Sequence, residues 1–320
     1  MKKKILIIGG GGYIGNALID NLSKKKFNIL IFDNLIYGQK FSKKVKFIPG
    51  DIRKNKDIQK ISAKYYAVIY LAGLVGDPIT KKYKRISKII NEKFTKKLIF
   101  NFYKNGNAEK FIFVSTCSNY GFSKSKYLKE DDNLNPLSLY AKSKVKIEKF
   151  LLNLKKKKDF SPTILRFATA FGLSGRMRFD LTVNQFTRDL YKKKYLEVYD
   201  FNTWRPYCHV KDFARLIEKI ITKEKYLTDY EVFNCGGNSN NFTKKQISKK
   251  IQKYTGGKIT FLKKSLDKRN YVVDFSKVRK KLNFKPKFTV DYGIKEILKD
   301  LKKNKSNLNN QNLGNYKIKI

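Results

Sequence analysis

Ile5-Leu6-Ile7-Ile8-Gly9-Gly10-Gly11-Gly12-Tyr13-Ile14-Gly15 is an apolar run that ends in four glycines and then restarts with a second apolar pattern. The run predicts a buried strand over 4–8, and the spacing that follows predicts a helix over 13–24. Glycines at positions 9, 12 and 15 permit a tight turn, close backbone approach to a pyrophosphate, and close packing of helix on strand. The helix N-terminus adds amide donors and a favourable dipole for an anion.

The same alternation of apolar runs and helical patterns continues along the chain. We expect further strands at 28–32, 45–48, 67–71, 111–115 and 163–167, with longer helices at 85–103 and 139–154. Such alternation predicts an α/β protein with a Rossmann-type, doubly wound parallel sheet. From about residue 174 short strands and helices mix, which predicts a smaller C-terminal α/β domain over the carboxyl edge of the sheet.

The chain of 320 residues is long enough for two such domains. We expect residues 1–173 to form the nucleotide-binding domain with the reactive side chains. Residues 174–301 are expected to form mainly the substrate domain, with some segments returning to the main sheet. The Lys/Asn-rich tail over 302–320 is expected to be frayed.

An acidic residue ends the second predicted strand, about twenty residues after the glycine loop. A carboxylate at Asp33 can accept hydrogen bonds from an adenosine ribose and repels a 2′-phosphate, so the prediction is NAD rather than NADP. The nearby Lys40, Lys43 and Lys44 leave NADP open as the alternative.

Tyr140-Ala-Lys-Ser-Lys144 places a phenol and an ammonium one helical turn apart. A cation near the hydroxyl favours the phenolate, so we expect Lys144 to lower the pKa of Tyr140 from about 10 towards neutrality. A tyrosine tuned in this way can take the proton from an alcohol that is being oxidised. The alternative is an ordinary aromatic residue beside a solvated lysine, since lysine is common in this chain.

Basic residues far outnumber acidic ones, 72 to 26, giving a net charge of +46. The lysines are scattered rather than clustered, so nucleic-acid binding is kept only as a secondary hypothesis. No apolar run approaches the ~20 residues that cross a bilayer. The three cysteines form no CxxC pair, so we expect no metal site and a reduced, cytoplasmic protein without membrane contact. His209, the single histidine, is expected to be structural.

With these features in order, the chain resembles the extended short-chain dehydrogenase/reductases, and within them the NAD-dependent nucleotide-sugar epimerase/dehydratase family. Further similar motifs are Gly50-Asp51-Ile52, Tyr70-Leu71-Ala72-Gly73, Ile90-Asn91 with Thr95, Val114–Gly121, Trp204–Asp212 and Phe233–Gly237. The resemblance spans about residues 4–300. It implies NAD-binding roles for Gly9, Gly12, Tyr13, Ile14, Gly15, Asp33, Asn34, Asp51, Ile52, Leu71, Ala72, Gly73, Asn91, Lys144 and Phe167.

The resemblance also implies a catalytic set of Thr116, Tyr140 and Lys144, and a nucleotide-diphosphate sugar as substrate. Substrate contacts are then expected from Val75, Ser118, Asn119, Thr169, Arg178, Asn184, Arg205 and Arg269. The block 165–187 is similar to bacterial enzymes of surface-polysaccharide precursors, and points to a subgroup acting on a GDP-heptose. Two helices of the kind predicted at 85–103 and 139–154 often form a homodimer interface in this family.

One departure from the family's pattern bears on the reaction. Members that dehydrate a sugar carry Asp-Glu directly after the catalytic threonine, whereas this chain has Cys117-Ser118. Dehydration is therefore disfavoured. The prediction is oxidation at C4 of a hexose-like sugar by an epimerase or dehydrogenase, with a 4-keto-sugar reductase as the alternative. A non-catalytic Rossmann protein that binds nucleotides or RNA is the alternative from a different class.

Overall fold

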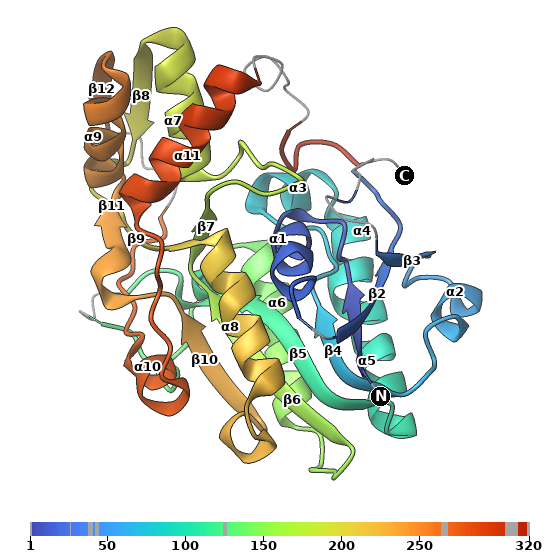
Figure 1. Ribbon diagram of the computed structural model, residues 1–320. Helices are drawn as coiled ribbons and strands as arrows, with labels where there is room; N and C mark the ends of the chain where they lie inside the picture. Colours follow the sequence, from blue (N-terminus) through green and yellow to red (C-terminus); the bar gives the residue numbers. More distant parts are fainter. Residues whose placement is uncertain are drawn as a thin grey trace.

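Parallel strands form the centre of the molecule in the computed structural model, which describes residues 2–25, 27–37, 41, 45–123, 127–263, 268–304 and 313–318 (Figure 1). Within these residues the main sheet has seven strands in the order β10-β6-β5-β4-β1-β2-β3. Their bounds are β1 Lys3–Ile8, β2 Phe27–Asp33, β3 Lys46–Pro49, β4 Tyr65–Tyr70, β5 Ala108–Thr116, β6 Phe160–Phe167 and β10 Glu231–Cys235. Each strand pairs in parallel with its neighbours. The predicted Rossmann-type sheet is therefore confirmed.

Both faces of this sheet are covered by helices, which explains the continuous apolar runs of its strands. Alternate side chains of β1 enter two different cores, Ile5 and Ile7 on one face, and Leu6 and Ile8 on the other. The first core is closed by α1 (Tyr13–Leu22) and α8 (Val210–Thr222), and the second by α5 (Thr95–Asn105) and α6 (Leu139–Leu152). Each fully buried apolar side chain contributes about 1.5–3 kcal/mol to folding.

The predicted helix over 85–103 is interrupted by a π-helical stretch. It consists of α4 (Lys84–Lys88), the π-helix Ile89–Phe94, and α5. Thr95 Oγ1 donates to Ile90 O at 2.8 Å. The π-helix contains Asn91, whose side chain reaches the loop after β4. A local change of helical winding near a site is a frequent feature of functional helices.

A smaller layer lies beyond the carboxyl edge of the sheet (Figure 1). Its own core includes Phe171, Leu190, Val198, Ile251 and Ile294. The helices around it are α7 Thr182–Lys193, α9 Lys244–Thr255 and α11 Val290–Lys303. Its strands form two small sheets, β11-β9-β7 and β12-β8, with bounds β7 Thr169–Phe171, β8 Tyr195–Tyr199, β9 Trp204–His209, β11 Asn241–Thr243 and β12 Lys258–Leu262.

The shorter α-helices are α2 Asn55–Gln59, α3 Asp77–Lys82 and α10 Ser276–Leu282, and the 3-10 helices are η2 Cys117–Tyr120, η3 Lys225–Leu227 and η4 Asn238–Asn240. None of the helices in the described part of the chain is both long and apolar enough to span a bilayer.

The end of the chain differs from the expectation of a frayed tail. Leu313 and Ile318 pack against the two cores of the main sheet, and Asn315 is 5% exposed. The prediction of fraying is therefore wrong for the segment Leu313–Ile318. Lysine- and asparagine-rich composition carries no local sign of these long-range contacts.

Candidate active site

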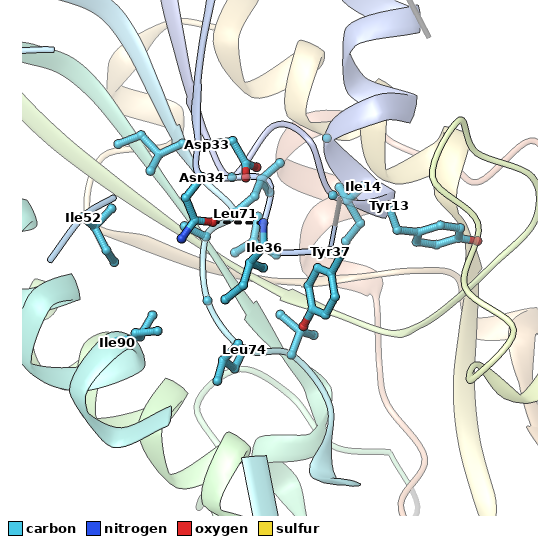
Figure 2. A pocket seen from close by; sticks show the side chains of 18 of the residues that line it. Tyr13, Ile14, Asp33, Asn34, Ile36, Tyr37, Ile52, Leu71, Leu74 and Ile90 are labelled. Carbon is cyan, nitrogen blue, oxygen red and sulfur yellow. Dashed lines mark hydrogen bonds between the residues drawn. The ribbon is translucent and has the colours of Figure 1, made fainter. Parts of the chain in front are cut away.

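A cleft opens at the carboxyl ends of the central strands (Figure 2). It lies where β1 is flanked by β2 on one side and β4 on the other, which is the point where doubly wound sheets bind ligands. The predicted residues that line it are Gly9, Gly12, Tyr13, Ile14, Gly15, Asp33, Asn34, Asp51, Ile52, Leu71, Ala72, Gly73, Val75, Tyr140, Lys144 and Arg178. The structure thus brings together residues separated by up to 169 positions, from Gly9 to Arg178.

The glycine motif has no room for side chains at Gly9 in the loop after β1 or at Gly15 in the first turn of α1. Gly9 has φ +84°, and a Cβ there would lie 2.4 Å from Ala72 N. A Cβ on Gly15 would lie 2.2 Å from Gly10 O. The helix that follows has no side-chain cap at Gly12, so its first turn offers backbone amides. This cradle fits the pyrophosphate of a dinucleotide.

Asp33 fixes the other side of the loop. Its Oδ2 accepts from Gly11 N at 2.9 Å, and its Oδ1 accepts from Leu35 N at 2.7 Å. Burial raises the pKa of the carboxyl, while these backbone donors and the charge of Arg176 oppose that rise. The position at the end of β2 fits an adenosine ribose. Lys40, Lys43 and Lys44, which left NADP open, lie outside the described residues.

Three predicted residues form the rim beyond Asp33. Arg53 Nη2 pairs with Asp51 Oδ2 at 2.6 Å, and Asn34 Nδ2 donates to the same oxygen at 3.4 Å. Ile52 lines the cleft beside them. Figure 2 shows Ile52 and Asn34 on the same side of the cleft as Asp33.

Tyr140 and Lys144 both lie on α6 and line the cleft. The helix begins at a Ser138 cap, whose Oγ accepts from Ala141 N at 3.2 Å, so Tyr140 lies in its first turn. Lys144 Nζ lies 5.8 Å from the Tyr140 ring centroid and donates to Val114 O at 2.7 Å. The four-residue spacing on the helix therefore places the Lys144 ammonium beside the Tyr140 ring, as predicted.

In the protein without cofactor the pKa of Tyr140 shifts in the opposite direction to the prediction. Burial raises the pKa of Tyr140, and the positive charge of Arg178 opposes that rise. Burial also lowers the pKa of Lys144 to about 8, with the charge of Glu148 opposing the change. A buried ammonium does not lower the pKa of the phenol to about 7, because desolvation penalises both the ammonium and the phenolate.

Arg178 lines the cleft from the loop between β7 and α7, where its charge acts on Tyr140. It is 9% exposed, and its Nε donates to Asp180 Oδ1 at 3.0 Å. Although Arg178 pairs with Asp180, its positive charge still lowers the pKa of Tyr140. A buried cation next to the phenol is suited to stabilise a phenolate or a substrate oxygen.

Four further residues from distant parts of the chain gather beside the start of α3, outside the cleft lining. Arg205 lies over the Tyr271 ring at 5.1 Å and donates to Arg269 O. Ser118 Oγ and Tyr271 Oη are 3.3 Å apart. Arg269 Nη1 pairs with Asp77 Oδ2 at 2.6 Å, which joins the two layers at the start of α3. Two guanidinium groups on neighbouring segments fit a diphosphate.

Two predicted contact residues act on the walls of the cleft. Asn91 accepts from Leu74 N and donates to Leu74 O, both at 2.9 Å, so it holds the loop after β4. Asn184 is fully buried, accepts from Gly172 N at 2.9 Å and donates to Arg178 O at 3.0 Å. Both side chains position residues that line the cleft.

The remaining predicted residues lie outside the cleft lining. Phe167 stacks on Phe213 in the core, with ring centroids 3.8 Å apart. Asn119 is fully buried and donates to Glu148 Oε1 at 2.7 Å. Thr169 lies in β7, and Thr116 Oγ1 accepts from Ser118 N at 3.1 Å at the end of β5. Phe167 and Asn119 therefore pack against the core and are not part of the cleft lining.

Cys117 is 1% exposed, and burial raises the pKa of its thiol. Its Sγ donates to Arg166 O at 3.2 Å. A buried thiol of this kind cannot serve as a dehydratase acid, in agreement with the departure seen in the sequence.

Several lining residues had not been predicted, among them Ile36, Tyr37, Leu74 and Asn315. Figure 2 shows the Tyr37 ring between Ile14 and Leu74. Leu74 directly follows a quoted motif and could have been included. Tyr37 and Asn315 carry no sequence signal, because their place depends on tertiary contacts alone.

Comparison with known proteins agrees with this site. The profile of the NAD dependent epimerase/dehydratase family matches residues 5–236. A UDP-glucose 4-epimerase from Lactobacillus helveticus is 27% identical over 309 residues, covering 89% of this chain and 92% of that protein. The structure of a UDP-glucuronic acid 4-epimerase from Bacillus cereus, in complex with UDP-glucuronic acid and NAD, is 25% identical with a TM-score of 0.83, and the match covers 94% of this chain and 99% of that one. A UDP-glucose 4-epimerase from Thermotoga maritima, solved with UDP-glucose, has the same fold, with a TM-score of 0.84, 24% identity, and coverage of 94% and 99%.

Proposed function

The chain belongs to the NAD-dependent epimerase/dehydratase family and its cofactor is NAD; from this premise, we propose that it oxidises and re-reduces C4 of a nucleotide-diphosphate sugar. The observation that carries the proposal is the single cleft shared by the glycine loop, Asp33 and the Tyr140/Lys144 pair. The curated relative and the solved neighbour with NAD are both named as 4-epimerases of UDP-sugars, which supports a UDP-hexose as the first substrate to test.

The glycine loop and Asp33 would hold the pyrophosphate and the adenosine ribose, and Lys144 the ribose next to the nicotinamide. When bound, NAD supplies the hydride acceptor for the sugar C4 and, in its oxidised form, a positive charge. The side chains of this chain then supply the proton chemistry and the orientation.

Tyr140 is the proposed base that removes the proton from the 4-hydroxyl as the C4 hydride leaves. The charge of Arg178 favours the phenolate that this requires, against the rise in pKa that burial causes at Tyr140. Thr116 is the proposed partner that orients the reacting sugar oxygen. Arg205 and Arg269 hold the diphosphate, and Ser118 with Tyr271 lines the approach to it.

The outcome depends on what the 4-keto sugar does in the cleft. Rotation before re-reduction inverts C4 and gives an epimerase, which is the outcome we favour because of the named relatives. Departure of the ketone gives a dehydrogenase, and the reverse reaction a 4-keto-sugar reductase. Dehydration is disfavoured because Cys117 is buried and Ser118 faces a tyrosine.

A panel of UDP-, GDP- and dTDP-hexoses separates these outcomes. NAD-loaded protein is incubated with each sugar, and products are analysed for C4 configuration and NADH. Inversion without net NADH supports the epimerase, and a 4-keto product with stoichiometric NADH supports the dehydrogenase. NAD-loaded protein that converts no sugar in the panel contradicts the proposal, and a steep salt dependence of RNA affinity would then favour the non-catalytic alternative.

A further inference from the structure

The segment Leu313–Ile318 follows α11 in the sequence and returns to the cofactor cleft. Asn315 lines the cleft at 5% exposure, and its Nδ2 donates to Val75 O at 2.8 Å. Val75 lies in the loop between β4 and α3 and also lines the cleft. Figure 1 shows this segment in red, close to α3. Asn315 therefore belongs to the wall of the site.

Arg176 holds this segment through both ends of its guanidinium. Its Nη1 donates to Asn315 Oδ1 at 2.6 Å, and its Nη2 donates to Gly314 O at 3.0 Å. The same guanidinium lies 4.3 Å from the centroid of the Tyr37 ring. Arg176 and Tyr37 both line the cleft. Charge-assisted bonds of this kind are stronger than bonds between neutral groups.

Phe179 anchors the segment on both sides of Asn315 in the sequence. Phe179 N donates to Leu313 O at 2.7 Å, and Tyr316 Oη donates to Phe179 O at 3.2 Å. Leu313 packs against the core under α1 and α8, whereas Ile318 packs against the core under α5 and α6. The segment thus crosses the carboxyl edge of the sheet from one face to the other.

We propose that Leu313–Ile318 is a strap over the NAD cleft, that Asn315 is an additional residue of the cofactor site, and that Arg176 holds the strap in place. NAD then leaves the cleft only after the bonds from Arg176 to Asn315 and Gly314 have broken. The strap keeps one cofactor molecule in place through both halves of a reaction that oxidises and re-reduces its substrate. The inference rests on the NAD cofactor alone and is independent of which sugar is used.

The rate at which bound NAD leaves the protein tests the strap. Protein loaded with NAD is diluted into an enzymatic NAD trap, and release is followed over time without any sugar. Asn315→Ala removes the acceptor of a charge-assisted bond and the donor to Val75, so release should accelerate at least roughly tenfold. Asn304→Ala is the matched control, because exposed Asn304 donates to Asp300 Oδ1 at 2.7 Å at the end of α11, away from the cleft lining. Its release rate should equal that of the wild type.

A second variant separates the strap from a simple contact by Asn315. Leu313 does not line the cleft, so Leu313→Ser loosens the anchor and leaves the Asn315 side chain intact. Faster release in both Asn315→Ala and Leu313→Ser supports the strap, as does slower hydrogen exchange of the 314–316 amides when NAD is bound to the wild type. Release rates within twofold of the wild type in both variants, or acceleration in Asn315→Ala alone, would overturn it. Loss of sugar turnover with the NAD results intact would count against the proposed reaction and leave the strap standing.

Discussion

Lys144→Met should stabilise the cofactor-free protein at neutral pH, although it removes a residue that the proposed chemistry needs. Lys144 is 6% exposed, and burial lowers its pKa to about 8 from the usual 10.5. At pH 7 the wild type therefore carries a buried charge that the unfolded chain holds in water. The difference of about 2.5 pKa units corresponds to a cost of about 3 kcal/mol.

The sign of the pH dependence follows from proton binding. Between about pH 8 and 10.5 the unfolded chain keeps the Lys144 proton that the folded protein has lost, so wild-type stability rises with pH across that window. Methionine binds no proton, so Lys144→Met lacks this contribution to the pH dependence of stability. The stability advantage of Lys144→Met over the wild type should accordingly shrink by about 2 kcal/mol between pH 7 and pH 9.5. The lost hydrogen bond to Val114 O lowers the advantage at every pH and cancels in this difference.

Urea unfolding of both proteins at the two pH values measures the difference, with NAD removed beforehand. Lys142→Met serves as the control, because Lys142 lies on the same helix and is exposed. Its stability difference from the wild type should not change with pH. If the difference in free energy of unfolding between Lys144→Met and the wild type stays constant within about 0.5 kcal/mol between the two pH values, Lys144 is not a buried ammonium with a lowered pKa.

Three further results are expected. Asp33→Asn should lower the preference for NAD over NADP by roughly tenfold or more in fluorescence titrations, since a neutral amide no longer repels the 2′-phosphate; an unchanged ratio would argue against Asp33 as the ribose ligand. Glu148→Gln should lower the free energy of unfolding by about 3–5 kcal/mol, because Arg166 Nη2 pairs with Glu148 Oε2 at 2.8 Å with both side chains buried, and Arg166→Met in the same chain should recover part of that loss. Arg269→Ala should raise KM for the nucleotide sugar by roughly tenfold or more and leave NAD affinity unchanged; equal effects on both ligands would contradict its place at the diphosphate.

The nucleotide-binding half was predictable because its signals are local. The apolar run of β1, the glycine spacing and Asp33 at the end of β2 all lie within the first 33 residues. The first residues of β5 and β6 were harder to predict. Lys110 lies inside β5 and is 2% exposed, because its Nζ donates to Ile220 O at 2.9 Å at the end of α8. Pro162 likewise lies inside β6, so both strands begin earlier than their residue types suggest.

The geometry of the Tyr140/Lys144 pair was predictable, and its electrostatics was not. Spacing of four residues on a helix fixes the proximity of Tyr140 and Lys144, whereas burial by distant segments decides their pKa values. Arg178, which opposes the rise at Tyr140, is 38 residues away in sequence. Asn315 is a stronger case, since every partner that places it in the cleft lies at least 139 residues away.

The loss of turnover in Tyr140→Phe is the most direct test of the account. Wild type, Tyr140→Phe and the exposed-site control Tyr127→Phe are loaded with NAD, and inversion at C4 of the best sugar in the panel is followed by NMR. Tyr140→Phe should retain NAD and turn over more slowly by about 10²–10⁴-fold, as expected for loss of a general base, while Tyr127→Phe should match the wild type. A Tyr140→Phe rate within tenfold of the wild type would contradict the assignment of Tyr140 as the base.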